Sequence, residues 1–460
     1  MGHDEVTLAL TEATWKEIAH ALDLRVESAA VLVARSATTR AGRLLLGRQL
    51  HWVPDEHYTA RQTLRLSIRS QGYVPALGAA AQDGASAIFL HTHPGGDPAP
   101  SLADEVVDDE LRSVFGDRTR TDRYVSLIVG GTSDRPRFSG RVYEPGSASP
   151  RPLTRLRIVG GWLSITRTDA TSFRQPESVF DRQVQAFGRS GQAILRSIRV
   201  GIVGAGGTGS AVYEQLVRLG VADIVVVDDD VIDDHNVTRI HESDLADIGR
   251  PKVEVLEQRG RDIGLGTGTT AIRKKLRSPE VVAHLTDRDV VFGCTDDDFG
   301  RAVLSRLAYW YLIPVFDMGV VVDSDARGIN DVFGRVTFIA PGSPCLLCRG
   351  RVDASRLAWD SLTDAERRGR VHEGYVPELA EAAPSVISYT SLVASMAVSE
   401  MLTRLFRLGE PDPPSEILIR VVGRAISRNA SEPKRDHFCS DPATWGRGDE
   451  VTPLGWIWPV

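Results

Sequence analysis

The segment VGIVGAGGTGS, residues 200–210, decides the fold of the C-terminal part of the chain. The helix-like run AVYEQLVRLG (residues 211–220) and the strand-like run VADIVVVDDD (residues 221–230) follow it. Strand, glycine turn, helix and strand in this order predict a parallel βαβ unit, and therefore an α/β domain with a mostly parallel sheet. Glycines at the turn let the backbone approach a phosphate at a helix N-terminus, and Asp228 ends the next strand, where an acid can hold a ribose hydroxyl. A dinucleotide-binding oxidoreductase is the first interpretation to test.

Three charged motifs beyond this unit argue for a different reaction. They are DDDVIDDHNVTR (residues 228–239), GRPKV (residues 249–253) and GCTDDDFGR (residues 293–301). Hydride transfer has no use for these charges. Splitting ATP between its α- and β-phosphates, in contrast, requires cations against the leaving pyrophosphate and an acid that holds Mg²⁺. The motifs therefore favour transfer of an adenylyl group from ATP to a carboxylate.

These motifs resemble the ThiF/MoeB/HesA family, which includes the activating enzymes of ubiquitin and of sulfur-carrier proteins. The likeness runs from Phe180 to Cys439 and implies a Rossmann-like domain that uses ATP and Mg²⁺. The resemblance implies that the nucleotide loop consists of Gly204, Gly206, Gly207 and Gly209. It implies that Asp228 binds the ribose, that Asp230 also lies at the nucleotide, and that Asp296 is a ligand of magnesium. The phosphates would be contacted by Asn236, Arg239 and Lys252. In FDRQVQAFG (residues 180–188), Arg182 would reach the ATP of the other subunit, which implies a homodimer.

The chain has four cysteines, too few for a disulfide framework in 460 residues. Cys345 and Cys348 lie in SPCLLCRGR (residues 343–351), where relatives carry the first half of a structural zinc site. The usual second C-x-x-C near the C-terminus is missing, and RDHFC (residues 435–439) offers Cys439 with His437 or Asp436 instead. A second, structural Zn²⁺ in a Cys₃His site is one interpretation; a vestigial site and a redox pair are the alternatives.

The segment between residues 349 and 385 contains no cysteine, although thioester-forming members of the family carry one in or near this crossover loop. The remaining cysteine, Cys294, lies beside Asp296, at a position that belongs to the nucleotide site in relatives. We therefore expect an acyl-adenylate that is released directly to another protein's thiol, to sulfide or to an amine.

The N-terminal part reads as α+β, with strands expected at residues 29–34, 87–90, 124–129 and 156–165 and a helix at residues 102–114. The segment LHTHPGGDPAPSLAD, residues 90–104, places His91 and His93 on one face of a strand, with Asp104 after a Gly/Pro-rich turn. Three such ligands leave the fourth tetrahedral position of a zinc ion open for water, as in catalytic sites. The competing interpretation is a solvated loop with Asp104 capping the helix.

The order Glu27, His91-x-His93-Pro94 and Ser101-x-x-Asp104 resembles the motif of the JAMM (MPN+) metalloproteases, which are deubiquitinases and processors of ubiquitin-like proteins. The likeness covers about the first 150 residues and implies a cytidine-deaminase-like α+β fold. It implies that His91, His93 and Asp104 hold a catalytic Zn²⁺, that Glu27 is the base, and that Ser101 supports the oxyanion.

Composition and patterning predict two domains: a metallopeptidase domain at residues 1–168, a linker at 169–179, an adenylyltransferase domain at 180–440 and a tail at 441–460. A formal net charge of -7 without a basic block argues against nucleic acid as a partner. No apolar run approaches the length of a membrane span, and we expect a cytoplasmic protein.

Together the two motif sets suggest a bifunctional enzyme of a bacterial ubiquitin-like protein system. One domain would trim or remove the modifier, and the other would activate its C-terminus. The expected partners are a ubiquitin-like or sulfur-carrier protein and a conjugating enzyme. The alternatives are adenylation of a short peptide or a metabolite carboxylate, and a non-catalytic scaffold that binds a ubiquitin-like protein.

Overall fold

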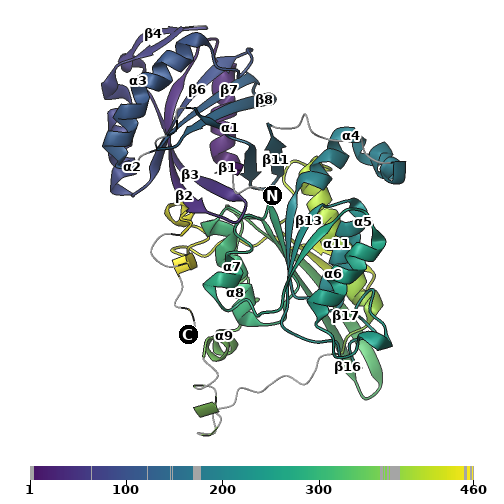
Figure 1. Cartoon of the computed structure of the whole chain (residues 1–460). Helices are drawn as coiled ribbons and strands as arrows, with labels where there is room; N and C mark the ends of the chain where they lie inside the picture. The colour runs from purple at the N-terminus through teal and green to yellow at the C-terminus, as the bar shows by residue number, and fades with distance from the viewer. Residues whose placement is uncertain are drawn as a thin grey trace. The chain divides into compact units, whose positions relative to one another are not determined.

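The computed structural model describes residues 5–168, 178–362 and 384–449 except 64, 122, 146 and 148, together with 366, 368, 369, 372, 453–455 and 458. The chain divides into two compact units, each with its own sheet (Figure 1). Unit 1 holds Met1–Gly160, Ser164–Thr171 and Pro442–Asp449, and unit 2 holds Gly161–Leu163, Ser172–Asp441 and Glu450–Val460. The expected linker lies outside the described residues apart from 178 and 179, which begin the 3-10 turn Ser178–Phe180.

Within the described part of unit 1, nine strands form one curled mixed sheet in the order β11-β10-β1-β3-β2-β6-β7-β8-β9. The strands are β1 (Glu5–Thr11), β2 (Ala29–Thr38), β3 (Gly42–Trp52), β6 (Ser86–Pro94), β7 (Tyr124–Thr132), β8 (Arg135–Tyr143), β9 (Arg151–Pro152), β10 (Arg155–Val159) and β11 (Leu163–Arg167). A separate hairpin joins β4 (Tyr58–Gln62) to β5 (Arg65–Ile68). The helices are α1 (Glu12–His20), α2 (Val74–Gln82) and α3 (Leu102–Thr119).

The two faces of this sheet carry separate hydrophobic cores, because successive side chains of a strand point to opposite faces. Ile88 and Leu90 of β6 pack in the core that contains Trp15 of α1. Phe89, between them, packs in the other core, with Leu77 of α2 and Phe115 of α3. The alternation assigns His91 and His93 to the face that α2 and α3 cover.

The sequence-based boundaries in unit 1 need two corrections. The single strand expected at residues 156–165 is wrong, because β10 and β11 are separate strands joined by a short turn at residues 160–162. Gly160 and Gly161 lie in this turn, and paired glycines favour a turn over a continuous strand. The strand expected at residues 87–90 is in fact longer and ends at Pro94, so both histidines belong to it.

Within the described part of unit 2, eight strands form a sheet in the order β14-β13-β12-β15-β16-β17-β18-β19. The strands are β12 (Arg199–Val203), β13 (Asp223–Val227), β14 (Gly268–Ile272), β15 (Val290–Gly293), β16 (Val315–Asp325), β17 (Gly328–Ile339), β18 (Glu416–Arg420) and β19 (Ala425–Arg428). The pairs from β14 to β16 are parallel, as the βαβ pattern predicts, and the pairs from β16 to β19 are antiparallel.

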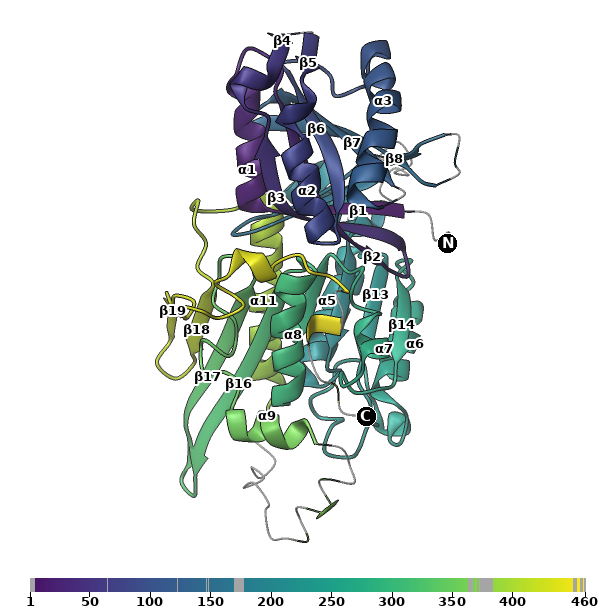
Figure 2. The same ribbon diagram turned by 90° about the vertical axis from the view of Figure 1, so that its left-hand side faces the viewer.

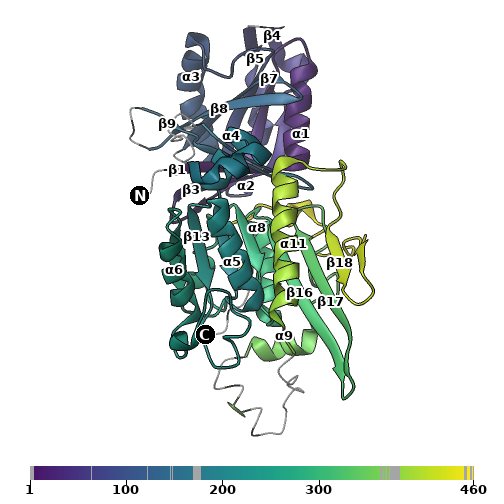
Figure 3. The same cartoon turned by 90° about the vertical axis from the view of Figure 1, so that its right-hand side faces the viewer.

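Helices cover both faces of this sheet, as in Rossmann-type folds (Figures 2 and 3). The helices of the described part of unit 2 are α4 (Asp181–Ser197), α5 (Gly207–Leu219), α6 (Lys252–Ile263), α7 (Pro279–Val282), α8 (Asp298–Trp310), α9 (Ala354–Asp360) and α11 (Ile387–Phe406). Figure 3 shows α5 and α11 side by side on one face, and Figure 2 shows α8 on the other. Among the described residues, no helix has the length and apolar character needed to cross a bilayer.

Candidate functional site

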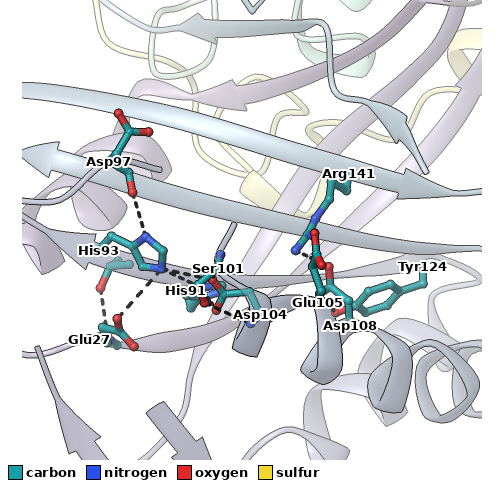
Figure 4. Close-up of polar contacts among 12 residues, drawn as sticks. Glu27, His91, His93, Asp97, Ser101, Asp104, Glu105, Asp108, Tyr124 and Arg141 are labelled. Carbon is teal, nitrogen blue, oxygen red and sulfur yellow. Dashed lines mark hydrogen bonds and ion pairs between the residues drawn. The ribbon is translucent and has the colours of Figure 1, made fainter. Parts of the chain in front are cut away.

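Three side chains of unit 1 converge where β6 ends and α3 begins (Figure 4). The Nε2 atoms of His91 and His93 lie 3.1 Å apart. Asp104 Oδ1 lies 3.1 Å from His91 Nε2, and Asp104 Oδ2 lies 3.7 Å from His93 Nε2. Tetrahedral ligands about 2.0–2.1 Å from a zinc ion stand roughly 3.3 Å from one another. The donor atoms and their spacing therefore fit a zinc ion.

The loop between the histidines and Asp104 is held in place from several sides. Asp97 accepts a hydrogen bond of 2.8 Å from His93 Nδ1 with its backbone carbonyl, which leaves Nε2 of that ring free to face the cluster. Its carboxylate pairs with Arg137 of β8 at 3.2 Å. The loop also crosses directly over Gly130 of β7, where a Cβ atom would lie 2.8 Å from the carbonyl oxygen of Gly96. A larger residue at 130 would push the loop away.

Asp104 has a structural role as well as its place in the cluster. Ser101 caps α3 by accepting a hydrogen bond from the backbone N–H of Asp104, and the Asp104 carboxylate accepts one of 2.7 Å from the backbone N–H of Ser101. The cap expected in the competing interpretation is therefore present, together with the convergence on His91 and His93. Burial raises the pKa of Asp104, but hydrogen bonds from His91 and Ser101 outweigh it and hold the pKa well below its usual range.

One turn further along α3, a buried network fixes the helix to the sheet, and nothing in the sequence motif indicated it. Asp108 accepts a hydrogen bond of 2.8 Å from the hydroxyl of Tyr124 (Figure 4) and one of 3.2 Å from the hydroxyl of Tyr143. Arg141 Nη2 lies 2.6 Å from the same carboxylate. These contacts tie α3 to β7 and β8 one turn beyond Asp104.

Glu27 lies just before β2 and is buried, with Oε1 4.0 Å from His93 Nε2. Its backbone carbonyl accepts a hydrogen bond of 3.0 Å from Arg61 of β4, so the hairpin holds the residue in place. Burial raises the pKa of Glu27 to about 7, although the charge of His93 lowers it. A carboxyl group with such a pKa at this distance suits exchange of a proton near the cluster.

A cavity of about 1050 Å³ lies in unit 2 at the carboxyl ends of the parallel strands. Gly204, Gly206 and Gly207 line it at the start of α5, and Gly209 packs behind them, where a Cβ atom would lie 1.8 Å from Gly204 O. A glycine-rich turn at a helix N-terminus presents backbone N–H groups to anions. The predicted nucleotide loop therefore faces the cavity.

The side chains predicted to contact the ribose, the phosphates and magnesium within one subunit gather at the same cavity, with the exception of Asn236. Asp228, Asp230, Arg239, Lys252 and Asp296 all line it. Asn236 is not among the lining residues, and its Oδ1 accepts a hydrogen bond of 3.4 Å from Arg239 Nη2. The amide thus positions the Arg239 guanidinium.

In the structure these charges are partly paired with one another. Asp228 accepts backbone hydrogen bonds from Ala205, at 2.6 Å, and Asp230, at 2.8 Å. Burial raises the pKa of Asp228, although the Ala205 N–H and the charge of Lys252 lower it. Lys252 Nζ lies 2.7 Å from Asp230 Oδ2. A phosphate in the cavity would compete with Asp230 for this ammonium group.

The three consecutive aspartates after β15 have different surroundings. Asp296 is exposed and lines the cavity, so its carboxylate is accessible to an ion there. Asp297 caps α8 and accepts a hydrogen bond of 2.7 Å from Gly300 N. Asp298 is buried. Asp297 lines the cavity as well, but its carboxylate is engaged at the start of α8, so Asp296 has the more accessible carboxylate and its role as a magnesium ligand stays a prediction.

The far half of the cavity was not anticipated from the sequence. It is lined by one face of β16 to β19, with Gly319, Arg335 and Leu418 near the nucleotide loop and Val321, Phe333 and Arg420 further out. Alternating apolar and polar residues in β16 and β17 are the signal that could have identified this face.

Cys345, Cys348, His437 and Cys439 form a second cluster in unit 2, with ligand atoms within 4.8 Å of one another. His437 Nδ1 lies 3.2 Å from the Sγ atom of Cys439 and 3.4 Å from that of Cys348. The structure thus selects His437 over Asp436 as the fourth donor. Three thiols and an imidazole at these distances fit a tetrahedral zinc ion.

Two further predicted positions are placed as follows. Arg182 lies exposed on α4, away from the cavity-lining residues of its own chain, and its role on a second subunit stays a prediction. Cys294 lines the cavity, and burial raises the pKa of its thiol well above the usual range. Cys294 is therefore a poor nucleophile.

Comparisons with known proteins bear on unit 2. A SAMP-activating enzyme E1 from Haloferax volcanii is 30% identical over 163 residues, which make up 35% of this chain and 56% of that protein. The molybdopterin-synthase adenylyltransferase of Escherichia coli is 28% identical over 177 residues, 38% of this chain and 68% of the relative. The sulfur carrier protein ThiS adenylyltransferase of Bacillus subtilis is 29% identical over 164 residues, 35% of this chain and 46% of the relative. The chain thus spans about half to two thirds of the length of these relatives.

Among solved structures, that of Escherichia coli MccB is similar with a TM-score of 0.45 and 15% identity, over 60% of this chain and 75% of that one. Residues 180–440 match the ThiF family. Since this match extends over more than half of the sequence, the chain belongs to the ThiF family.

Proposed function

We propose that unit 2 uses ATP to adenylylate the C-terminal carboxylate of a ubiquitin-like or sulfur-carrier protein. The observation that carries the proposal is one cavity that joins a glycine loop, the cations Arg239 and Lys252, and the accessible carboxylate of Asp296. The names of the relatives, which include an adenylyltransferase for the sulfur carrier ThiS and an activating enzyme for SAMP, support the same chemistry.

In the proposed reaction, a carboxylate oxygen attacks the α-phosphorus of ATP, and the bond to the bridging oxygen breaks as pyrophosphate leaves. Arg239 and Lys252 offset the charge that builds up on the leaving group. Mg²⁺ held by Asp296 would neutralise phosphate charge when bound. The acyl-adenylate then passes to an external thiol, sulfide or amine, because burial raises the pKa of the Cys294 thiol and residues 349–385 contain no cysteine.

Exchange of labelled pyrophosphate into ATP tests this proposal, with the carrier protein ThiS as acceptor. We expect exchange in the wild type that depends on the acceptor, and a loss of roughly 100-fold or more in Asp296→Ala. Asp234→Ala, at an exposed aspartate outside the cavity lining, is the matched control and should keep the wild-type rate. Exchange that persists in Asp296→Ala contradicts the proposal. Exchange with a short peptide but not with the protein would instead assign the peptide as substrate.

We also propose that unit 1 is a zinc metallopeptidase of the JAMM type that trims or removes the modifier. The convergence of His91, His93 and Asp104, with Glu27 close to them, carries this proposal. A zinc ion at these donors would supply a Lewis acid for the amide carbonyl and for water. Glu27 is placed to take a proton and pass it to the leaving amine. The Ser101 oxygen accepts from Asp104 N, which leaves its hydroxyl hydrogen for the developing oxyanion.

Cleavage of a linear fusion of ThiS to a C-terminal reporter, measured together with zinc content, tests the second proposal. Glu27→Gln should keep the zinc but lose roughly 100-fold or more in cleavage rate, since it cannot accept the proton. The matched control is Glu105→Gln, a nearby carboxylate on α3 that lies 4.0 Å from Arg141. Wild-type protein that purifies without zinc in unit 1, or cleavage unchanged in Glu27→Gln, refutes the assignment.

A further inference from the structure

Arg335 is a cavity-lining cation to which neither sequence motif assigns a role. It lies in β17, in register with Gly319 of β16 and with Leu418 of β18. Two residues along the same strands, Asp317, Thr337 and Glu416 form the next cross-strand row, which is fully buried. Residues two apart share a face of a sheet, so the Arg335 side chain lies beside this buried polar row.

The contacts of Arg335 hold its guanidinium in a defined place. Nη2 lies 2.7 Å from Asp317 Oδ2, and Nη1 donates a hydrogen bond of 2.5 Å to Thr337 Oγ1. The guanidinium extends across Gly319, where a Cβ atom would lie 3.0 Å from Nη2. Glycine at 319 therefore makes room for it. A guanidinium has five N–H donors, so several remain for a ligand beyond these contacts with the described residues.

The Arg335 guanidinium lies close to the predicted magnesium ligand, Asp296. Asp317 is in register with Gly293 of the parallel neighbour β15, and its Oδ1 lies 3.2 Å from where a Cβ atom of Gly293 would be. Asp296 follows Gly293 by three residues and lines the same cavity. Arg335 is thus held beside the strand end from which the predicted magnesium ligand projects.

The wall of the cavity around Arg335 carries more positive than negative charge, although the buried carboxylate of Asp317 lies within it. Asp317 lies between two guanidinium groups, those of Arg335 and Arg301, whose Nε is 3.6 Å from Oδ1. Glu416 likewise faces Arg349 and Arg351. Asp298 also attracts Arg301. The side chains that line the cavity include more cations than carboxylates, with Arg301, Arg335 and Arg351 on this wall. An anion is the ligand that such a wall favours.

We propose that Arg335 binds the terminal carboxylate of the polypeptide that is to be adenylylated, and that it is a specificity-determining residue for a free C-terminus. The inference rests on the adenylylation proposed above. Two anions, the carboxylate and the triphosphate, must approach each other before the oxygen–phosphorus bond forms. A planar guanidinium contacts both oxygens of a carboxylate and offsets this repulsion. The apolar side chains of Val321 and Phe333, further along the same face, then lie beneath the preceding residues of an extended chain.

Calorimetric titration tests the proposal with a synthetic peptide that ends in a free glycine carboxylate and with its C-terminal amide. Both are titrated into the full-length protein, with and without a non-hydrolysable ATP analogue. We expect the wild type to prefer the carboxylate. Arg335→Gln should weaken carboxylate binding by about tenfold or more and leave amide binding unchanged, so that the preference disappears.

Arg420→Gln is the matched control, because Arg420 is on the same face of the sheet, lines the outer end of the cavity and pairs with Asp331. It should keep the preference for the carboxylate. If Arg335→Gln does not fold, Gly319→Ala displaces the guanidinium without removing it and should reduce the preference in the same direction.

A wild type without preference for the carboxylate, an Arg335→Gln variant that keeps it, or equal loss in Arg420→Gln overturns the inference. Titration of the ATP analogue alone separates this result from the proposed function. Failure to bind nucleotide contradicts adenylylation, whereas normal nucleotide binding without carboxylate preference contradicts only the role of Arg335.

Discussion

The candidate metal sites of the two units differ in the number and type of their donors. The unit 1 cluster brings two imidazoles and one carboxylate together, His91, His93 and Asp104, and a further carboxylate, Glu27, stands 4.0 Å from one of them. The unit 2 cluster has three thiols and one imidazole. Zinc is usually four-coordinate, so four protein donors close a site, whereas three leave one position open. The difference supports the catalytic role proposed for the unit 1 cluster and a structural role for the unit 2 cluster.

The donors of the two clusters also differ in how far apart they lie along the sequence. The donors of unit 1 lie within residues 91–104, on one strand and the next helix. In unit 2, Cys345 and His437 are 92 residues apart. A metal ion that joins distant segments removes more conformational freedom from the unfolded chain than one that joins near neighbours. Loss of metal should therefore destabilise unit 2 more than unit 1.

The largest expected effect is on the thermal stability of unit 2. Cys439→Ala removes a buried donor and should release one zinc equivalent. A loss of about 4 kcal/mol would lower the unfolding midpoint of a unit of this size by roughly 8–16 °C. Zinc analysis and scanning calorimetry measure both effects.

Cys294→Ser is the matched control, since Cys294 lies outside the cluster. It should keep the zinc content. Zinc content unchanged in Cys439→Ala would show that the four residues hold no metal. Unit 2 would then have no closed zinc site to compare with the open site of unit 1.

Loss of zinc from the three-donor site of unit 1 should have a smaller effect on stability. His93→Ala should release the other zinc equivalent and abolish cleavage of the fusion substrate, while the midpoint of unit 1 changes by less than about 3 °C. The reason is that His93 lies at the end of β6, where truncation leaves the hydrophobic cores intact. Zinc analysis and the reporter assay check the prediction, and a variant that retains both zinc equivalents contradicts it.

The sequence predicted the features that depend on local pattern. The βαβ unit around Gly204 follows from one apolar run, one glycine turn and one helical segment, and the structure confirms it. The spacing of His91 and His93 likewise predicts that they share one face of a strand, whereas the approach of Asp104 to them was implied by the resemblance to the JAMM motif.

Features that depend on pairing between distant segments were missed. The hairpin of β16 and β17 could not be read from local pattern, since its outer half, DSDARGIND (residues 323–331), is polar and lacks a strand pattern. Arg335 and Asp317 meet only because these strands pair, so no local motif could indicate their contact.

The smallest expected effect concerns the hydrogen bonds between Asp108 of α3 and the sheet, and it tests whether they help to position the proposed zinc ligand Asp104. Tyr124→Phe removes one hydrogen bond from the buried Asp108 carboxylate and should lower stability by about 1–2 kcal/mol. Zinc affinity of unit 1 should fall by less than about tenfold, because Asp104 lies on the same helix one turn earlier and its other contacts remain.

Tyr143→Phe, which removes the longer bond to the same carboxylate, is the matched comparison and should cost less in both measurements. Denaturant unfolding and competitive zinc titration provide the two readouts. If Tyr124→Phe lowered stability without changing zinc affinity, the network would support the fold of α3 alone. A parallel decrease in both would show that the position of Asp104, and with it the geometry of the three-donor site, depends on the Asp108 contacts.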